Sequence, residues 1–560
     1  MAQQGVEGSR GKTGAAAGRS WGVFALAGLG LFYLNSLLTF QNAWPTPWIR
    51  LVPELAIEVL VLLGILGLLR AAGFRLGGWI RGGLCALLFV AFVLRYIEVT
   101  APPLFGRGLN LYWDVQHLPN LIAMFWRSAS LPQALLAAVG FFAGIALLVW
   151  LIWLALTWLE RAVDLRRGRV VAILGGAVAA VVFAGAIAAD YGPLRRAFAI
   201  PATAIASKHI GFVSEAFRLR RAGAAYVEER FALSDATDSD LAGLGGDPVF
   251  VVFIESYGTT AIDDPRHRPA VVPALQGLEA RLRQAGWHSL SNRLISPTFG
   301  GGSWWAHATL LSGARLSDQT LYSLFVTTDR ETLVSQFNDA GYRSVAVLPG
   351  IQRHWPEGAF FRFDKVYDAA GLAYPGPDFG FWRIPDQYSL RRFEMQELSR
   401  KGQPLFALIV LIMSHMPFQP LPPYVADWSG LDDGQAYDRE ATRQLVEQEQ
   451  DWTDLSRSYV AALDYNLRIL GDFIVDSLPE NALVVVVGDH QPPALLTGGG
   501  QPWTVPIHLL SRNADRLAPF RDRGYRPGLL PEDNGAKGME TFFGDFLRAY
   551  DSAADLQAER

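Results

Sequence analysis

The chain has 560 residues, a formal net charge of −4 and 51% hydrophobic residues. It carries no long basic run and no alternation of aromatic and basic residues, so we expect no nucleic-acid partner. Its single cysteine, Cys85, excludes a disulfide framework. The apolar residues are concentrated in the first third, which is the distribution of a membrane protein.

Five apolar segments follow the N-terminal tail 1–20, at 21–40, 51–69, 82–94, 134–158 and 170–189. A bilayer core needs about 20 apolar residues per helix. The second segment carries Glu54 and Glu58 near its start, and the third is short unless it extends past Arg81 and Arg95. The first segment has no small-residue cleavage site after it and should remain as an anchor. We predict a five-helix transmembrane domain over 21–190.

Basic residues indicate how these helices are oriented. Arginine and lysine are frequent in the tail and in the segments 70–81 and 161–169, whereas the segment between the first two spans has only Arg50. The positive-inside rule then places the N-terminus in the cytoplasm. Five crossings put everything beyond Asp190 outside the cytoplasm, and six would put it inside.

Residues 191–245 read as juxtamembrane linker helices, with apolar residues at spacings of three and four and arginines between them. Such a helix could lie on the membrane surface or pack on the following domain. From 246 to 560 the pattern becomes that of an α/β domain. Strands are predicted at 249–254, 343–348, 405–412, 483–487 and 505–510, separated by amphipathic helices. This alternation predicts a mainly parallel sheet covered on both faces.

Two of these strands end in candidate metal ligands. Four valines run into Gly488, Asp489 and His490, and the strand 249–254 runs into Glu255. The simplest interpretation is that Gly488 and Asp489 form a turn and that Glu255 is a solvent-exposed acid at the end of a strand. However, ligands in α/β sheets bind at the carboxyl ends of the strands, and carboxylate with imidazole suits zinc or manganese. We therefore expect a metal site that these residues share.

Between the two strands lies the segment SPTFGGGSWWAHATLLSG, residues 296–313. Its glycines permit sharp turns, and Ser303 follows them where a helix could begin. Ser303 could be an N-cap, or a nucleophile at a helix N-terminus that favours an anion such as phosphate. A nearby metal ion would lower the pKa of its hydroxyl. His307, one turn later, could assist proton transfer or could simply pack.

The motifs FIESYG, FGGGSWWAH, LIMSHMPF and VVVVGDHQPP together resemble the alkaline phosphatase and sulfatase superfamily, specifically its membrane-anchored lipoteichoic acid synthase-like branch. The resemblance covers nearly the whole chain and implies five spans, a linker helix and an extracytoplasmic α/β sulfatase-like domain. It also implies one divalent metal ion, manganese first with zinc or magnesium as alternatives, held by Glu255, Ser303, Asp489 and His490. Ser303 would be the nucleophile. The substrate phosphate would be held by His415, with Arg353 and Trp355 as further candidates.

The resemblance implies a transferase in a bacterial cytoplasmic (inner) membrane, with its catalytic domain on the periplasmic side. It would move phosphoglycerol or phosphoethanolamine from a membrane phospholipid donor to a glycan, polymer or lipid acceptor of the envelope. The branch usually has threonine where this chain has Ser303. Classical sulfatases need a C/S-x-P-x-R context, and Trp304 and Trp305 follow Ser303 instead. The alternatives are a phosphodiesterase, phosphatase or sulfatase-type hydrolase that uses water, and a non-catalytic sensor that retains the fold.

Overall fold

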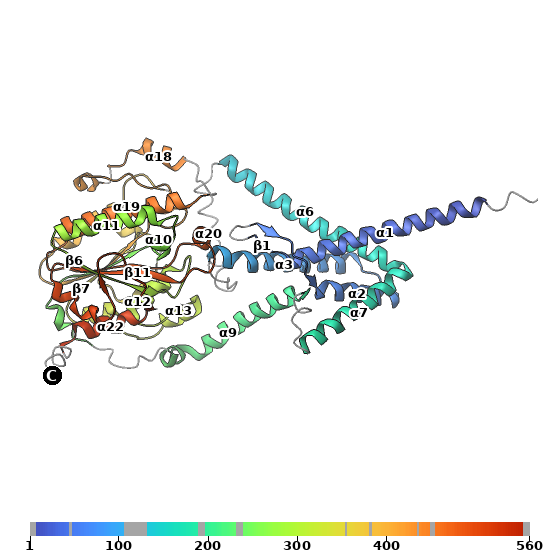
Figure 1. The fold of residues 1–560 in the computed structure, drawn as a ribbon, viewed down its shortest axis with the longest axis horizontal. Coiled ribbons are helices and arrows are strands. Elements are labelled where there is room, and N and C mark those ends of the chain that lie inside the picture. The colour runs from blue at the N-terminus through green and yellow to red at the C-terminus, as the bar shows by residue number, and fades with distance from the viewer. Residues whose placement is uncertain are drawn as a thin grey trace, which may run out of the picture. The chain divides into compact units, whose positions relative to one another are not determined.

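The computed structural model describes residues 7–43, 48–105, 131–188, 197–230, 239–352, 355–379, 383–433, 436–447 and 454–552. The chain divides into two compact units, and the boundary between them falls between Ser214 and Glu215, within helix α9 (Pro201–Arg230). The first unit is helical, and the second is built around a large sheet (Figure 1).

The first unit contains long helices and short strand pairs. Two-residue strands pair as β1 with β2 and as β3 with β4. The helices are α1 (Glu7–Thr39), α2 (Ile57–Ala71), α3 (Gly78–Phe105), α6 (Leu131–Asp164), α7 (Arg166–Ala188) and α9 (Pro201–Arg230), and the strands are β1 (Gln41–Asn42), β2 (Ile49–Arg50), β3 (Leu55–Ala56) and β4 (Phe198–Ala199). Helix α9 lies within the segment 191–245, for which the sequence predicts linker helices, and is kinked at Gly223, whose φ is 66°.

Four helices in the described part of the chain are long and apolar enough to cross a membrane. The crossing stretches are Ser20–Thr39, Gly78–Pro102, Pro132–Asp164 and Arg166–Gly185. The remaining predicted span, 51–69, forms α2, which has 15 residues. At 1.5 Å per residue this helix is about 22 Å long, shorter than the roughly 30 Å of a bilayer core. Of the five predicted spans, four therefore form helices that are long and apolar enough to cross a membrane.

Small residues and ion pairs connect the helices of this unit. A Cβ on Gly64 of α2 would lie 3.4 Å from Gly176 Cα of α7, so the two helices touch through their backbones. Helix α3 extends past Arg81, as the third span required, and Arg81 donates to Glu160 of α6 at 2.9 and 2.5 Å. The arginine that shortened the predicted span is thus paired inside the helical unit.

The sheet of the second unit has the order β12-β6-β11-β10-β5-β9-β7-β8, with β13 beside β6. Its central strands β10, β5, β9, β7 and β8 are mutually parallel, whereas β11 runs antiparallel to both of its neighbours, β10 and β6. The strands are β5 (Val249–Ile254), β6 (His288–Ile295), β7 (Arg343–Val347), β8 (Lys365–Tyr367), β9 (Leu405–Leu411), β10 (Leu483–Gly488), β11 (Thr504–Ser511), β12 (Arg526–Pro527) and β13 (Lys537–Gly538).

Helices cover both faces of this sheet, as the sequence predicts: α11 and α19 lie on one face, α12 and α22 on the other (Figure 1). Every residue of β5, β9 and β10 is buried, which explains their uninterrupted apolar runs. The helices are α10 (Thr260–Asp263), α11 (Arg268–Gln284), α12 (Ser303–Ser312), α13 (Gln319–Phe325), α14 (Leu333–Asp339), α15 (Gly358–Phe361), α16 (Ala369–Leu372), α17 (Asp386–Phe393), α18 (Arg439–Glu447), α19 (Ser456–Asp472), α20 (Ala494–Thr497), α21 (Ala518–Arg521) and α22 (Thr541–Tyr550). Helices α17 and α19 continue as π-helices, Glu394–Leu398 and Phe473–Ser477.

Candidate active site

The register of two parallel strands brings the predicted metal ligands together. Gly488, the last residue of β10, pairs with Ile254, the last residue of β5. The next residues, Asp489 and Glu255, therefore leave the sheet side by side. Donor atoms of Glu255, Asp489 and His490 all lie within 4.8 Å of one another, and all three residues are buried.

Ser303 joins this cluster from the other side. Gly302, with φ 81°, is the N-cap of α12, and Ser303 is the first residue of the helix. The Ser303 hydroxyl does not cap the helix by a hydrogen bond to a backbone N–H group. Instead Ser303 Oγ donates to Glu255 Oε2 at 2.9 Å and lies 3.2 Å from His490 Nε2. The structure thus places the four residues expected to hold a metal ion around one point, with the serine oxygen at the N-terminus of a helix.

Hydrogen bonds orient the ligands and leave their outer atoms facing one another. Asp489 Oδ1 accepts from the backbone N–H of Ser256 at 2.8 Å and of His490 at 2.6 Å. Asp489 Oδ2 is buried and has no hydrogen-bond partner among the described residues. His490 Nδ1 lies 2.7 Å from the carbonyl oxygen of Gln491 and must carry the proton, because a carbonyl only accepts. The Nε2 lone pair of His490 therefore faces the cluster.

These donors fit a divalent cation. Two carboxylates, an imidazole and a hydroxyl are ligands that manganese, zinc and related ions accept. Burial and the adjacent Glu255 raise the pKa of Asp489 well above its usual value. Burial alone would also raise the pKa of Glu255, but the interactions with His415 and His490 and the hydrogen bond from Ser303 outweigh it and lower that pKa to about 2. A cation would compensate this pair and would give Asp489 Oδ2 a partner.

His415 reaches the same edge from β9. Leu411, the last residue of β9, pairs with Ile254, so the segment after it runs beside Glu255. Ser414 Oγ donates to the Glu255 carbonyl oxygen at 2.5 Å, and His415 Nδ1 lies 2.6 Å from the carbonyl oxygen of Met416. Buried Asp386 accepts from the N–H groups of the two residues before Ser414, which fixes this segment, and burial raises the pKa of Asp386 to about 7.

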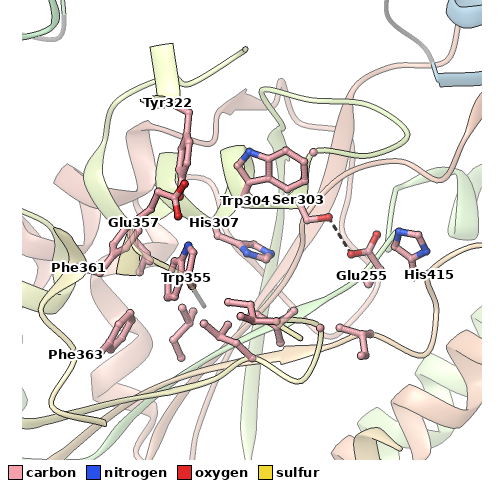
Figure 2. Close-up of a pocket in the computed structure, with 18 of the residues that line it drawn as sticks. Glu255, Ser303, Trp304, His307, Tyr322, Trp355, Glu357, Phe361, Phe363 and His415 are labelled. Atoms are coloured by element: carbon pink, nitrogen blue, oxygen red, sulfur yellow. Dashed lines mark hydrogen bonds between the residues drawn. The ribbon is translucent and has the colours of Figure 1, made fainter. Parts of the chain in front are cut away.

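A cavity of about 550 Å³ opens beside Ser303 (Figure 2). Glu255, Ser303, His415 and Trp355 all line it, so the structure brings two of the three predicted substrate-binding residues to one space. Arg353, the third, lies outside the described residues. His307 also lines the cavity, with its ring 4.3 Å from that of Phe253. Burial lowers the pKa of His307 to about 4, so it is neutral at pH 7, and its Nε2 has no partner among the described residues.

Several residues that shape the site were not found from the sequence. Gln491 Oε1 accepts from Thr260 Oγ1 at 2.6 Å, which connects the segment after β10 to α10. A Cβ on Gly258 would lie 1.8 Å from that same Gln491 Oε1, and one on Gly488 would lie 1.9 Å from the Tyr257 carbonyl oxygen. Glycines at the end of β10 and just beyond β5 are the available signal, because such positions often mark a close backbone approach.

Fold and site define an α/β domain with buried ligands for a divalent metal ion around a serine hydroxyl. Residues 309–505 match the sulfatase family model. The chain therefore carries a sulfatase-like domain, together with apolar N-terminal helices. The match includes His415, Asp489 and His490, whereas Glu255 and Ser303 precede it. No curated protein matches this chain.

Solved structures with similarity to this chain include three from bacteria. The lipoteichoic acid synthase LtaP from Listeria monocytogenes is 16% identical, with 57% of this chain and 81% of that chain covered and a TM-score of 0.36. The periplasmic domain of EptC from Escherichia coli in complex with Zn is 17% identical (47% and 72% covered, TM-score 0.33). The phosphoglycerol transferase GacH from Streptococcus pyogenes, in complex with sn-glycerol-1-phosphate, is 13% identical (53% and 74%, TM-score 0.31).

Proposed function

We propose that this protein is a membrane-anchored, metal-dependent transferase. It moves a phosphoglycerol or phosphoethanolamine headgroup from a membrane phospholipid to a hydroxyl group of an envelope glycan, polymer or lipid. The observation that carries the proposal is the position of Ser303: its hydroxyl lies 2.9 Å from Glu255 Oε2 and 3.2 Å from His490 Nε2, beside an open cavity.

The proposed reaction has two steps, each a displacement at phosphorus. The Ser303 hydroxyl directs its proton to Glu255 Oε2, so a lone pair of Ser303 Oγ can face the phosphodiester. A bond forms between Ser303 Oγ and phosphorus, the bond from phosphorus to the diacylglycerol oxygen breaks, and the proton lost by Ser303 leaves on that oxygen as diacylglycerol. The acceptor hydroxyl then attacks the same phosphorus, its proton passes to Ser303 Oγ, and the bond between Ser303 Oγ and phosphorus breaks.

Charge on the phosphate oxygens has to be stabilised in both steps. His415 lines the cavity beside Glu255 and Ser303. Its Nδ1–H points to the Met416 carbonyl oxygen, so as an imidazolium it would donate its Nε2–H to those oxygens. The N-terminus of α12 adds backbone N–H groups to the same side. Glu255, Asp489 and His490 would hold the divalent ion, for which we propose manganese; when bound, it lowers the pKa of the serine hydroxyl and neutralises phosphate charge.

Membrane anchoring fits a donor that stays in the bilayer. We propose that the catalytic domain lies outside the cytoplasm, in the periplasm of a bacterial cell. With the N-terminus in the cytoplasm, this requires an odd number of crossings. The four long helices of the described residues supply an even number, and we propose that α2, although shorter than a bilayer core, is the fifth crossing. Its glycine contact with α7 supports this, because α7 is itself long enough to cross.

Hydrolysis by the same residues is the second candidate, with water in place of the acceptor hydroxyl. It differs only in which molecule reaches the Ser303 intermediate. A sulfatase of the formylglycine type is disfavoured because Trp304 and Trp305 follow Ser303. A non-catalytic sensor would have no need of a complete ligand cluster.

The proposal is tested with the full chain in dodecyl maltoside micelles that contain Mn²⁺, phosphatidylglycerol and phosphatidylethanolamine. The maltoside hydroxyls serve as a sugar acceptor. We expect diacylglycerol and a phosphorylated maltoside, both lost in Ser303→Ala. Ser399→Ala is the matched control, because Ser399 is exposed and donates only to the Met395 carbonyl oxygen. Free phosphorylated headgroup as the sole phosphate product would favour the hydrolase, and unchanged turnover in Ser303→Ala would refute the serine route.

A further inference from the structure

The cavity beside Ser303 changes in character with distance from the metal ligands. Glu255, Ser303 and His415 line one part of it. On the other side of His307, Figure 2 shows Tyr322, Trp355, Glu357, Phe361 and Phe363 around the same space. A headgroup whose phosphate is at Ser303 would extend its alcohol part among these residues.

Aromatic rings form a continuous wall in this part of the cavity. The rings of Trp355 and Phe361 are stacked, with centroids 5.8 Å apart and an interplanar angle of 26°, and Phe363 follows at 6.3 Å from Phe361. A Cβ on Gly358 would lie 2.5 Å from the Trp355 ring. The glycine therefore allows the indole to lie over the backbone, which holds the ring in place.

A carboxylate faces the same space. Glu357 is half-buried, lines the cavity and points toward Tyr322 (Figure 2). Burial raises the pKa of Tyr322, and the nearby charge of Glu357 raises it further. Among the lining residues that the structure describes, none is a lysine or an arginine. The described residues that line this part of the cavity are therefore negative and aromatic.

Such a lining discriminates between the two headgroups of the proposed function. An ammonium group is attracted to the faces of aromatic rings and to a carboxylate. Neutral His307 adds a further acceptor, since a primary ammonium carries three N–H donors. A glycerol headgroup would offer only hydroxyls and would leave the negative charge of the half-buried Glu357 without a counter-charge.

We propose that this cavity binds the ammonium group of a zwitterionic aminoalkyl phosphate, with Glu357 as its counter-charge and Trp355 and Phe361 as its aromatic wall. The proposal rests on the proposed function, because it assumes that the phosphate of the same headgroup reacts at Ser303. Ethanolamine and choline share this chemistry and differ in size and in hydrogen-bonding capacity. Phosphatidylglycerol would then be a poor donor.

The test compares phosphatidylethanolamine, phosphatidylcholine and phosphatidylglycerol with identical acyl chains, using the full chain in micelles with Mn²⁺ and measuring diacylglycerol release. We expect kcat/KM for an ammonium lipid to exceed that for phosphatidylglycerol by at least about tenfold. Glu357→Gln should lower this ratio about tenfold. Glu532→Gln is the matched control, because Glu532 is exposed and does not line the cavity, and it should leave the ratio unchanged.

A second measurement needs no variant. Phosphoethanolamine or phosphocholine should inhibit the wild-type enzyme at a concentration at least about tenfold lower than glycerol phosphate. Turnover of phosphatidylethanolamine alone would assign a primary ammonium site, and turnover of phosphatidylcholine as well would assign a quaternary one. Ser303-dependent turnover that favours phosphatidylglycerol would refute the ammonium site and leave the transferase intact. No diacylglycerol from any lipid would refute both.

Discussion

Replacing Gly488 by alanine should separate the two strand ends that carry the metal ligands. A Cβ at Gly488 would lie 1.9 Å from the Tyr257 carbonyl oxygen, whereas carbon and oxygen normally approach to about 3.3 Å. The backbone must therefore move by about 1.4 Å. Both segments are built into the cluster, because Asp489 follows the glycine directly and Glu255 lies two residues before Tyr257.

Overpacking of this kind typically lowers the free energy of unfolding by about 1–3 kcal/mol. A displaced ligand should also weaken Mn²⁺ binding by about 10–100-fold. Calorimetric titration of the full chain with Mn²⁺ measures the affinity, and thermal unfolding measures the stability. Gly277→Ala is the matched control, because Gly277 lies in α11 and a Cβ there meets nothing within 4 Å. Wild-type Mn²⁺ affinity in Gly488→Ala would refute the reasoning.

Two further predictions concern buried groups away from the metal ligands. Burial lowers the pKa of His508 from 6.5 to about 3. The unfolded state therefore binds an extra proton below pH 6.5, and the free energy of unfolding decreases as the pH falls below that value. Its share between pH 7 and pH 5 is about 2 kcal/mol. In thermal unfolding, His508→Gln should therefore lose about 2 kcal/mol less stability than the wild type between pH 7 and pH 5. Equal losses in the two proteins would contradict the lowered pKa of His508. Buried Glu397 accepts from Arg343 at 2.8 and 3.0 Å, so Glu397→Gln should lower the free energy of unfolding by about 3 kcal/mol; a loss below about 0.5 kcal/mol would show that the pair contributes nothing.

Much of the site could be predicted because its residues directly follow sequence patterns that indicate a single kind of structure. An apolar strand of four valines belongs in the centre of a parallel sheet, and the residue after it must lie at the carboxyl edge. Glu255 and Asp489 were therefore predicted to be neighbours before any register was known. Ser303 followed from the glycines before it, since a helix that begins after such a turn presents its first residue at that edge.

Other features depend on contacts that no local pattern contains. Strand β6 was missed because its sequence, HSLSNRLI, is half polar. The buried hydroxyl of Ser291 finds its partners far along the chain, in His508 of β11 at 2.6 Å and in the Gly528 carbonyl oxygen. The role proposed for Glu357 likewise needs the cavity, which brings α15 beside α12 and α13. Helix α2 was expected over 51–69 but begins at Ile57, because the residues just before it form β3 and pair with β4.

The most direct test of the central claim is the intact mass of the purified protein after incubation with Mn²⁺ and the lipid mixture, alongside diacylglycerol release. The account predicts that wild-type protein gains the mass of a phosphorylated headgroup, that peptide mapping places it on Ser303, and that Ser303→Ala gains nothing and releases no diacylglycerol. Diacylglycerol release by Ser303→Ala at the wild-type rate, or an adduct on another residue, would contradict it.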